Sequence, residues 1–315
     1  MKFASYIFAF AQLFAFVAAP QGHAAGGPNV LAQVALIVDA RSGEPIFAKN
    51  ADRVAPIASI TKLMTAMVVL DAGQPLDELL RIEIDDVDFL KGSRSRLAIG
   101  TQLTRREMLR LALMSSENRS AHALARYYPG GVSAAVRAMN AKARALGMHR
   151  TRFVDPTGLS PENVSTAEDL TRLVAAAEGY ALIREFSTQR ESEVALEPGG
   201  RTLLFGNSNQ LVRSEGWNIL LQKTGFIREA GRCMVMLAQI ASRPVILVLL
   251  DSAGRLGRIG DAQRIRTWME TGEVLPLPSP EPVRKLLNTG QRSKYLLKAG
   301  MKRGKVAIKH KKRRR

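Results

Sequence analysis

The spacing of apolar residues differs between the two ends of the chain and its middle. Residues 34–38 form a short run of β-branched and aliphatic side chains, which predicts a buried strand. A turn signal at 41–44 leads into a returning strand at 45–49, so the globular part begins with a hairpin. Three more apolar runs predict strands at 218–224, 232–240 and 244–250. The short link between the last two strands requires an antiparallel pair.

The middle of the chain has helical spacing instead. Between residues 59 and 70 the apolar side chains recur on one helical face. Capping boxes at 104–107 and 165–168 mark two more helix starts. The remaining pattern predicts helices at 108–114, 120–128, 133–146, 169–178 and 259–270. Strands at both ends with helices between them predict an α+β fold, in which both chain ends build one antiparallel sheet with helices on its faces and a helical insertion.

Both termini depart from this globular pattern. One basic residue precedes an apolar run at 3–19, and small residues follow, which is typical of a cleaved secretory signal at 1–24. The alternative is a retained membrane anchor, but the run is shorter than the roughly 20 residues that a spanning helix prefers. Alternating prolines predict an extended linker at 276–283, which ends a catalytic domain at 25–275. We expect the basic tail at 284–315 to be disordered.

Composition limits the possible functions. The chain has 315 residues, 46% of them hydrophobic, which is enough for one large core or two small ones. Its single cysteine, Cys233, excludes an intrachain disulfide and any Cys-x-x-Cys site, and its position in an apolar strand predicts a buried, inert thiol. None of the four histidines belongs to a His-Glu-x-x-His motif. We expect His122 and His149 to lie on helix surfaces without partners, and we expect no metal and no cofactor.

The net charge of +18 is concentrated in the tail. Residues 284–315 contain 14 Lys and Arg and no acid, so 18 − 14 leaves +4 on the rest of the chain. Such a run binds phosphate groups, but export would remove the protein from nucleic acid, and we expect no nucleic-acid partner. Two interpretations remain open: a solvated tail, or adhesion to an anionic membrane or wall surface outside the cytoplasm.

A Ser-x-x-Lys sequence begins the first predicted helix. Ser59 and Lys62 are three residues apart, so their side chains share one helical face. Serine is a weak nucleophile and needs an adjacent base. Lysine can be that base if burial, a second cation or the helix N-terminus lowers its pKa. On its own the motif also fits a capping serine beside a solvated lysine.

Two further motifs are equally weak alone. Ser116 and Asn118 form a Ser-x-Asn sequence at a break between two predicted helices. Lys223, Thr224 and Gly225 lie on a predicted strand. Together with Ser-x-x-Lys, in this order and on helix, loop and strand, these motifs are typical of penicillin-binding proteins and serine β-lactamases.

On these motifs the sequence closely resembles the D-alanyl-D-alanine carboxypeptidase and endopeptidase family of low-molecular-weight penicillin-binding proteins. The resemblance extends from about residue 35 to residue 269. Other matching segments are 113–119, 153–159 and 165–170. The stretch at 223–226, followed by 229–233, is most similar to the endopeptidase branch. The resemblance implies the β-lactamase/D,D-peptidase type of α+β fold.

The resemblance implies catalytic roles for several residues. Ser59 would attack the carbonyl of a D-alanyl residue and form an acyl-enzyme, while Lys62 takes its proton. Ser116 would pass that proton to the leaving amine. The backbone N–H groups of Ser59 and Phe226 would form the oxyanion hole.

Other residues would bind the substrate. Asn118 would hold its peptide amide, and Lys223 with Thr224 would face the carboxylate beside the scissile bond. Gly225 would let the substrate strand lie against the protein strand.

Two positions depart from the pattern of many relatives. Glu117 stands where Gly or Asp is usual, and Phe226 stands where His or Thr often follows the Lys-Thr-Gly. Both bear on substrate choice. The sequence contains no Glu-x-x-Leu-Asn motif of the class A β-lactamase kind, so we do not expect fast deacylation of a bound penicillin.

We therefore expect a periplasmic serine D,D-peptidase that acts on peptidoglycan stem peptides and is acylated by β-lactams. An endopeptidase that cuts D-alanyl-diaminopimelyl cross-links is the first interpretation, and a D,D-carboxypeptidase is the second. An inactive wall-binding protein is the alternative from another class.

Overall fold

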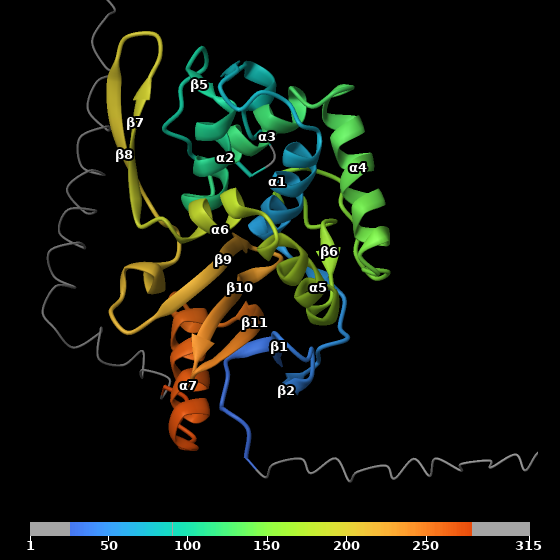
Figure 1. Cartoon of the computed structure of the whole chain (residues 1–315), viewed down its shortest axis with the longest axis vertical. Helices are drawn as coiled ribbons and strands as arrows, with labels where there is room; N and C mark the ends of the chain where they lie inside the picture. Colours follow the sequence, from blue (N-terminus) through green and yellow to red (C-terminus); the bar gives the residue numbers. More distant parts are fainter. Residues whose placement is uncertain (1–25, 90, 279–315) are drawn as a thin grey trace, which may run out of the picture. The chain divides into compact units, whose positions relative to one another are not determined.

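The computed structural model describes residues 26–89 and 91–278. Its centre is a five-stranded sheet in the order β2-β1-β11-β10-β9, in which all neighbouring strands are antiparallel (Figure 1). The strands are β1 (Ala32–Asp39), β2 (Pro45–Lys49), β9 (Asn218–Ile227), β10 (Gly231–Ile240) and β11 (Arg243–Ser252). Because β1 pairs directly with β11, both ends of the domain build one sheet, which confirms the predicted fold class.

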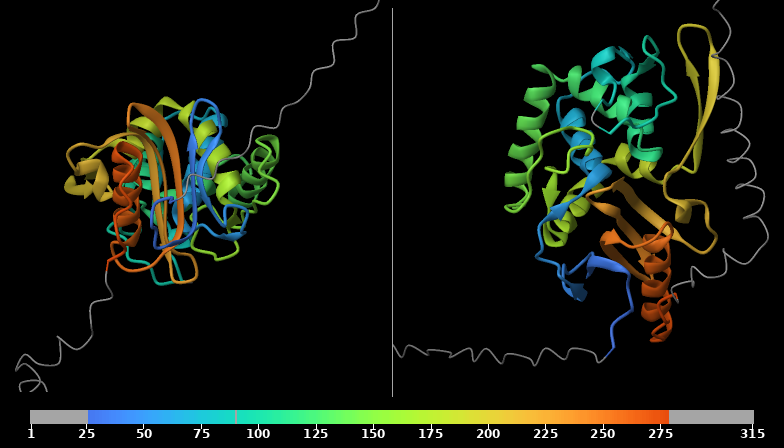
Figure 2. Two further views of the ribbon diagram at one scale, coloured as in Figure 1. Left: turned by 90° about the horizontal axis from the view of Figure 1, so that it is seen from below. Right: turned by 180° about the vertical axis from the view of Figure 1, so that it is seen from behind.

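Helices cover both faces of the sheet (Figure 2). The helix α7 packs on β10 and β11 from one side, while α5 and α6 pack on the other side. Alternate strand residues accordingly enter two separate apolar clusters: Met234 and Met236 face α7, whereas Val235 and Leu237 face the larger helical layer. The helices are α1 (Thr61–Asp71), α2 (Arg105–Met114), α3 (Asn118–Arg126), α4 (Gly131–Ala145), α5 (Ala167–Glu178), α6 (Ala181–Thr188) and α7 (Gly257–Thr271).

Local signals in the sequence identified several boundaries. Thr104 and Glu107 form the predicted capping box at the start of α2. The two-residue turn between β10 and β11, Ala241 and Ser242, has positive φ at both positions, as tight hairpins require. The second predicted capping box is wrong: Thr166 rather than Ser165 caps α5, and its side chain accepts a hydrogen bond from the Asp169 N–H.

Several short elements were not predicted from the pattern. They are β3 (Ala55–Pro56) with β6 (Val164–Ser165), β4 (Leu79–Arg81) with β5 (Gln102–Thr104), and the hairpin of β7 (Glu191–Leu196) and β8 (Arg201–Gly206). Most are too short for a periodic signal, and much of the β7–β8 hairpin is exposed. Three 3₁₀ turns complete the elements: η1 (Ala58–Ile60), η2 (Ile84–Asp86) and η3 (Gln210–Arg213).

Contacts divide the chain after Leu275. The expected signal at 1–24, most of the expected linker and the basic tail lie outside the described residues, so these boundaries stay predictions. Within residues 26–89 and 91–278, no helix has the length and apolar character needed to cross a membrane.

Candidate active site

Ser59 and Lys62 meet at the junction of η1 and α1. Ser59 lies in the 3₁₀ turn, and Lys62 lies in the first turn of the helix that follows. The Lys62 Nζ is 2.9 Å from the Ser59 Oγ. The two groups therefore lie within proton-transfer distance, as the Ser-x-x-Lys spacing predicts.

Lys62 is buried in a polar cage. Its Nζ also donates to the Thr157 carbonyl oxygen and to the Asn118 Oδ1, each at 2.7 Å. Burial lowers the pKa of Lys62 to about 7, although Asp155 and Glu117 act in the opposite direction. A substantial fraction of this lysine is therefore neutral near pH 7 and has a lone pair to accept the Ser59 proton.

The turn that carries Ser59 lies between two glycines. A Cβ on Gly225 of β9 would lie 2.9 Å from the Ser59 nitrogen and 2.9 Å from the Ala58 Cβ. A Cβ on Gly158, whose φ is +81°, would overlap the Ala58 carbonyl. Ala58 itself has a positive φ of 48°, which is costly for a residue with a side chain. In the structure, the missing side chain of Gly225 allows β9 to approach the Ser59 turn closely. The predicted approach of a substrate strand to β9 stays a prediction.

The loop before β6 supplies one of the lysine's partners. One carboxylate oxygen of Asp155 accepts hydrogen bonds from the N–H groups of Thr157 and Gly158, and the other accepts from the Ser160 N–H. The buried side chain of Asn163 accepts from Val154 and Asp155. These bonds fix the turn whose Thr157 carbonyl faces Lys62, a role that the sequence did not single out because a carbonyl leaves no residue-type signal.

The second motif lies on the opposite wall from β9. Ser116 has a φ of +63° between α2 and α3, and it lines the same cleft as Ser59. Asn118 begins α3, and its carboxamide joins Lys62 to Ser93, whose Oγ accepts from the Asn118 Nδ2 at 2.9 Å. The structure thus brings the first two motifs together, with Asn118 in direct contact with the lysine.

The third motif lies on β9. Lys223 is fully buried, as Lys62 is, and its Nζ donates to the Thr224 carbonyl at 2.9 Å. Its role toward a substrate carboxylate stays a prediction. Burial, and then the charges of Lys62 and Arg258, keep the pKa of Lys223 well below its usual value.

Thr224 and Phe226 line the cleft. The Thr224 hydroxyl is 2.8 Å from the Ser208 Oγ, and Arg258 donates to the Gly225 carbonyl at 2.9 Å. Ser208 and Arg258 thus join Thr224 as groups that can bind a carboxylate. Neither was predicted, because they lie far from the motifs in sequence and within no recognisable pattern.

These groups share one open cleft of about 700 Å³. Its walls are Ser59, Lys91, Ser93, Ser116, Asn118, Leu159, Ser208, Thr224, Gly225, Phe226, Ile227, Arg228, Glu229 and Arg258. We call the side with Ser59, Lys62, Ser116 and Asn118 the helical wall, and the side with β9, Ser208 and Arg258 the strand wall. An ion pair between Lys91 and Glu229 connects the helical wall to the turn after β9. Among the described residues, no three His, Cys, Asp or Glu side chains are grouped so as to bind a metal ion.

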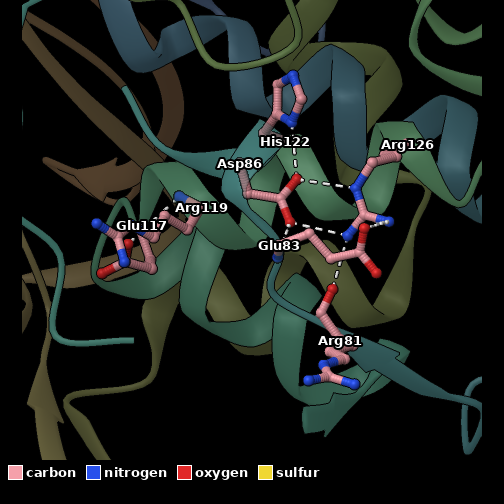
Figure 3. Close-up of polar contacts among 7 residues, drawn as sticks. All are labelled: Arg81, Glu83, Asp86, Glu117, Arg119, His122 and Arg126. Carbon is pink, nitrogen blue, oxygen red and sulfur yellow. Dashed lines mark hydrogen bonds and ion pairs between the residues drawn. The ribbon is translucent and has the colours of Figure 1, made fainter. Parts of the chain in front are cut away.

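A buried carboxylate, Asp86, joins η2 to α3 (Figure 3). Asp86 accepts a bidentate pair of hydrogen bonds from Arg126 and lies 2.8 Å from the His122 Nδ1. Burial favours a higher pKa for Asp86, but the bonds from His122 and Arg126 outweigh it and lower that pKa. The expectation that His122 lacks a partner is therefore wrong, because the contact joins residues 36 positions apart.

Cys233 matches its predicted character. The side chain is buried in β10, and burial raises the pKa of the thiol to about 12. The thiolate that reacts or binds metal is therefore disfavoured at neutral pH.

The family model described as D-alanyl-D-alanine carboxypeptidase matches residues 21–254. The chain belongs to this family. It is similar to a D-alanyl-D-alanine endopeptidase of Escherichia coli (strain K12), with 48% identity over 88% of this chain and 92% of that one. A D-alanyl-D-alanine endopeptidase of Pseudomonas aeruginosa is 54% identical over 78% of this chain and 79% of that one.

The same family appears among solved structures. The crystal structure of the Streptomyces K15 DD-transpeptidase aligns with a TM-score of 0.72 at 28% identity, and the alignment covers 77% of this chain and 98% of that chain. The fold of the D-alanyl-D-alanine peptidases therefore extends over most of the described residues.

Proposed function

We propose that this protein is a serine D,D-peptidase that cleaves D-alanyl-diaminopimelyl cross-links of peptidoglycan through an acyl-enzyme. The observation that carries the proposal is the contact of the Ser59 hydroxyl with the buried amine of Lys62, whose pKa lies at about 7. A neutral amine at 2.9 Å activates a serine hydroxyl without a histidine.

The geometry supports a definite sequence of steps. Neutral Lys62 accepts the Ser59 proton while the Oγ attacks the D-alanyl carbonyl, and the backbone N–H groups of Ser59 and Phe226 stabilise the oxyanion. Ser116 transfers the proton to the leaving amine, after which water hydrolyses the ester. Asn118 both positions Lys62 and is available to the peptide amide of the substrate.

The carboxylate beside the scissile bond would bind at the strand side. Thr224, Ser208 and Arg258 supply two hydroxyls and a guanidinium there. Lys223 would add a positive field to this side of the cleft, and its Nζ donates to the Thr224 carbonyl. Both an endopeptidase and a carboxypeptidase substrate carry this carboxylate, so the carboxypeptidase remains the alternative. The names of the two bacterial endopeptidase relatives favour the first assignment.

The decisive experiment compares two substrates. Purified protein is incubated with a cross-linked tetrapeptide dimer and with a monomeric pentapeptide, and the products are identified by mass spectrometry. We expect monomers from the dimer and no products with Ser59→Ala. If the protein released D-alanine from the pentapeptide and left the dimer uncleaved, the result would support the carboxypeptidase instead. A wild-type protein that neither cleaves substrate nor forms a penicillin adduct would be the inactive wall-binding protein.

We further propose that the protein is exported and that its basic tail adheres to an anionic membrane or wall surface. The support is the charge of the tail, since each cation near an anionic membrane contributes about 1 kcal/mol before screening. A protein truncated after Pro282 should cleave a small soluble substrate normally but co-sediment less with anionic vesicles at low salt. Equal sedimentation of both proteins would support the solvated tail.

A further inference from the structure

A second, smaller cavity lies beside the strand wall of the catalytic cleft. It has a volume of about 110 Å³, which is enough for several water molecules. Two of its lining residues, Ser208 and Arg258, also line the catalytic cleft, so the two spaces adjoin. The complete lining is Ser208, Gln210, Arg232, Arg255, Leu256, Arg258 and Ile259.

Three guanidinium groups converge on this cavity. Arg232 on β10, Arg255 before α7 and Arg258 in its first turn line it together, and no acidic residue belongs to the lining. Within the described part of the chain, none of the three forms an ion pair with an acid. The contacts that exist are with neutral groups: Arg232 lies over the Phe226 ring at 4.7 Å, and Arg258 donates to the Gly225 carbonyl.

Repulsion among these cations is not offset by an acid. Arg232 and Arg258 are partly buried and Arg255 is exposed, and burial together with the charge of Arg232 lowers the pKa of Arg258. The N-terminus of α7 carries a partial positive charge and favours acids in the first turn, yet that turn has none. Fixed donors of one sign around a small polar space are the arrangement that binds a carboxylate.

We propose that Arg232 and Arg255 form a second anion subsite, which binds the C-terminal carboxylate of the leaving peptide in a cross-linked substrate. This inference rests on the proposed function. The diaminopimelyl leaving group has one carboxylate beside the scissile bond, and its other end continues into a peptide that terminates in a second carboxylate. Free D-alanine, the leaving group of a carboxypeptidase, has only the first.

The two subsites therefore divide the substrate. Thr224, Ser208 and Arg258 hold the carboxylate that both reactions share. Only a leaving group long enough to extend past Ser208 can reach the second cavity. Arg232 and Arg255 are thus specificity residues for the cross-link, and they do not contact the reacting atoms.

The test uses the full-length protein with Arg232→Gln, Arg255→Gln and both together. We expect the double variant to raise KM for the tetrapeptide dimer at least about tenfold, since loss of a charge-assisted hydrogen bond weakens binding by about that factor or more. Acylation by a fluorescent penicillin and cleavage of the pentapeptide should change less than about twofold. A dimer whose terminal carboxyl is amidated should react equally with wild type and variant.

A matched control separates this effect from general charge. Arg53→Gln removes one positive charge from an exposed position away from both cavities and should leave all rates unchanged. The thermal midpoint of the double variant should equal or exceed that of wild type, because repulsion is removed.

An unchanged KM for the dimer, or an equal loss on every substrate, would overturn the subsite while the proposed function stands. A wild-type protein that leaves the dimer intact would overturn the proposed function, and with it the subsite.

Discussion

The two walls of the catalytic cleft are built in different ways. On the helical wall, Lys62 is fully buried, and its Nζ lies within hydrogen-bond distance of Ser59, Asn118 and Thr157. On the strand wall, Phe226 keeps 55% of its surface exposed, and the arginines beyond it have no acidic partners in the described part of the chain.

This difference separates chemistry from selectivity. The groups that move protons are already held in position before any substrate binds, which reduces the reorganisation needed in the transition state. The groups that receive the peptide instead keep exposed surface and unneutralised charge, and these gain partners only from a ligand. We therefore expect changes on the helical wall to affect every substrate, and changes to the side chains that line the strand wall to distinguish between substrates.

Replacing the lysine should give the largest effect on the helical wall. Lys62→Arg keeps the positive charge but removes the base, since guanidinium stays protonated. We expect acylation by penicillin to slow by about 10²–10⁴-fold, the contribution of a positioned base. Stopped-flow acylation with circular dichroism as a folding control measures this. A variant that acylates at the wild-type rate would identify another group as the base.

Gly225→Ala should break the contact between the two walls. Its new Cβ would lie 2.9 Å from the Ser59 nitrogen, so the turn or the strand must shift. A displaced nucleophile costs about 10²-fold in rate. Because every substrate needs the same turn, penicillin acylation and peptide hydrolysis should fall together.

The matched control for this change is Gly179→Ala. That glycine has a negative φ, and the nearest atom to its new Cβ would be 3.4 Å away. We expect normal rates from it. Equal activity of both variants would mean that the approach of β9 to η1 is not needed.

The helical wall should also determine the pH profile. With the pKa of Lys62 lowered to about 7, protonation below that pH removes the lone pair that accepts the serine proton. Acylation should fall about tenfold for each pH unit below about 7 and reach a plateau above it. Rates measured from about pH 5 to pH 9, with thermal midpoints at each pH, test this. A flat profile across that range would show that the base is not Lys62.

The ion pair between the walls should have the smallest effect. Lys91 and Glu229 are both partly exposed, so solvent weakens their attraction. A double-mutant cycle with alanine at each position should give a coupling of about fivefold or less in the unfolding equilibrium, and high salt should remove it. A coupling that survives about 1 M salt would mean that the two walls are tightly joined.

The sequence predicts the helical wall better than the strand wall, for physical reasons. The meeting of Ser59 with Lys62 follows from helix geometry over three residues, and the sheet follows from apolar runs at both ends. The burial of Lys223 could not be predicted, because β9 is buried on both faces at that point and shows no alternation.

Contacts between distant segments also escaped prediction. Ser208 reaches Thr224 from a loop, and Arg258 enters from α7. Each has an ordinary sequence neighbourhood, and only the packing of the fold brings it to the cleft. The same holds for His122, whose partner Asp86 lies on a different element.

The position of the Ser59 turn between two backbones affects how the enzyme could escape covalent inhibitors. An antibiotic that acylates Ser59 uses the same turn as the natural substrate. Gly158 and Gly225 already contact that turn so closely that a larger residue at either position would displace Ser59. Such a replacement would impair acylation by the antibiotic and by the natural substrate alike. Resistance that preserves activity should therefore arise on the strand wall, where a peptide and a drug of different shape meet different side chains.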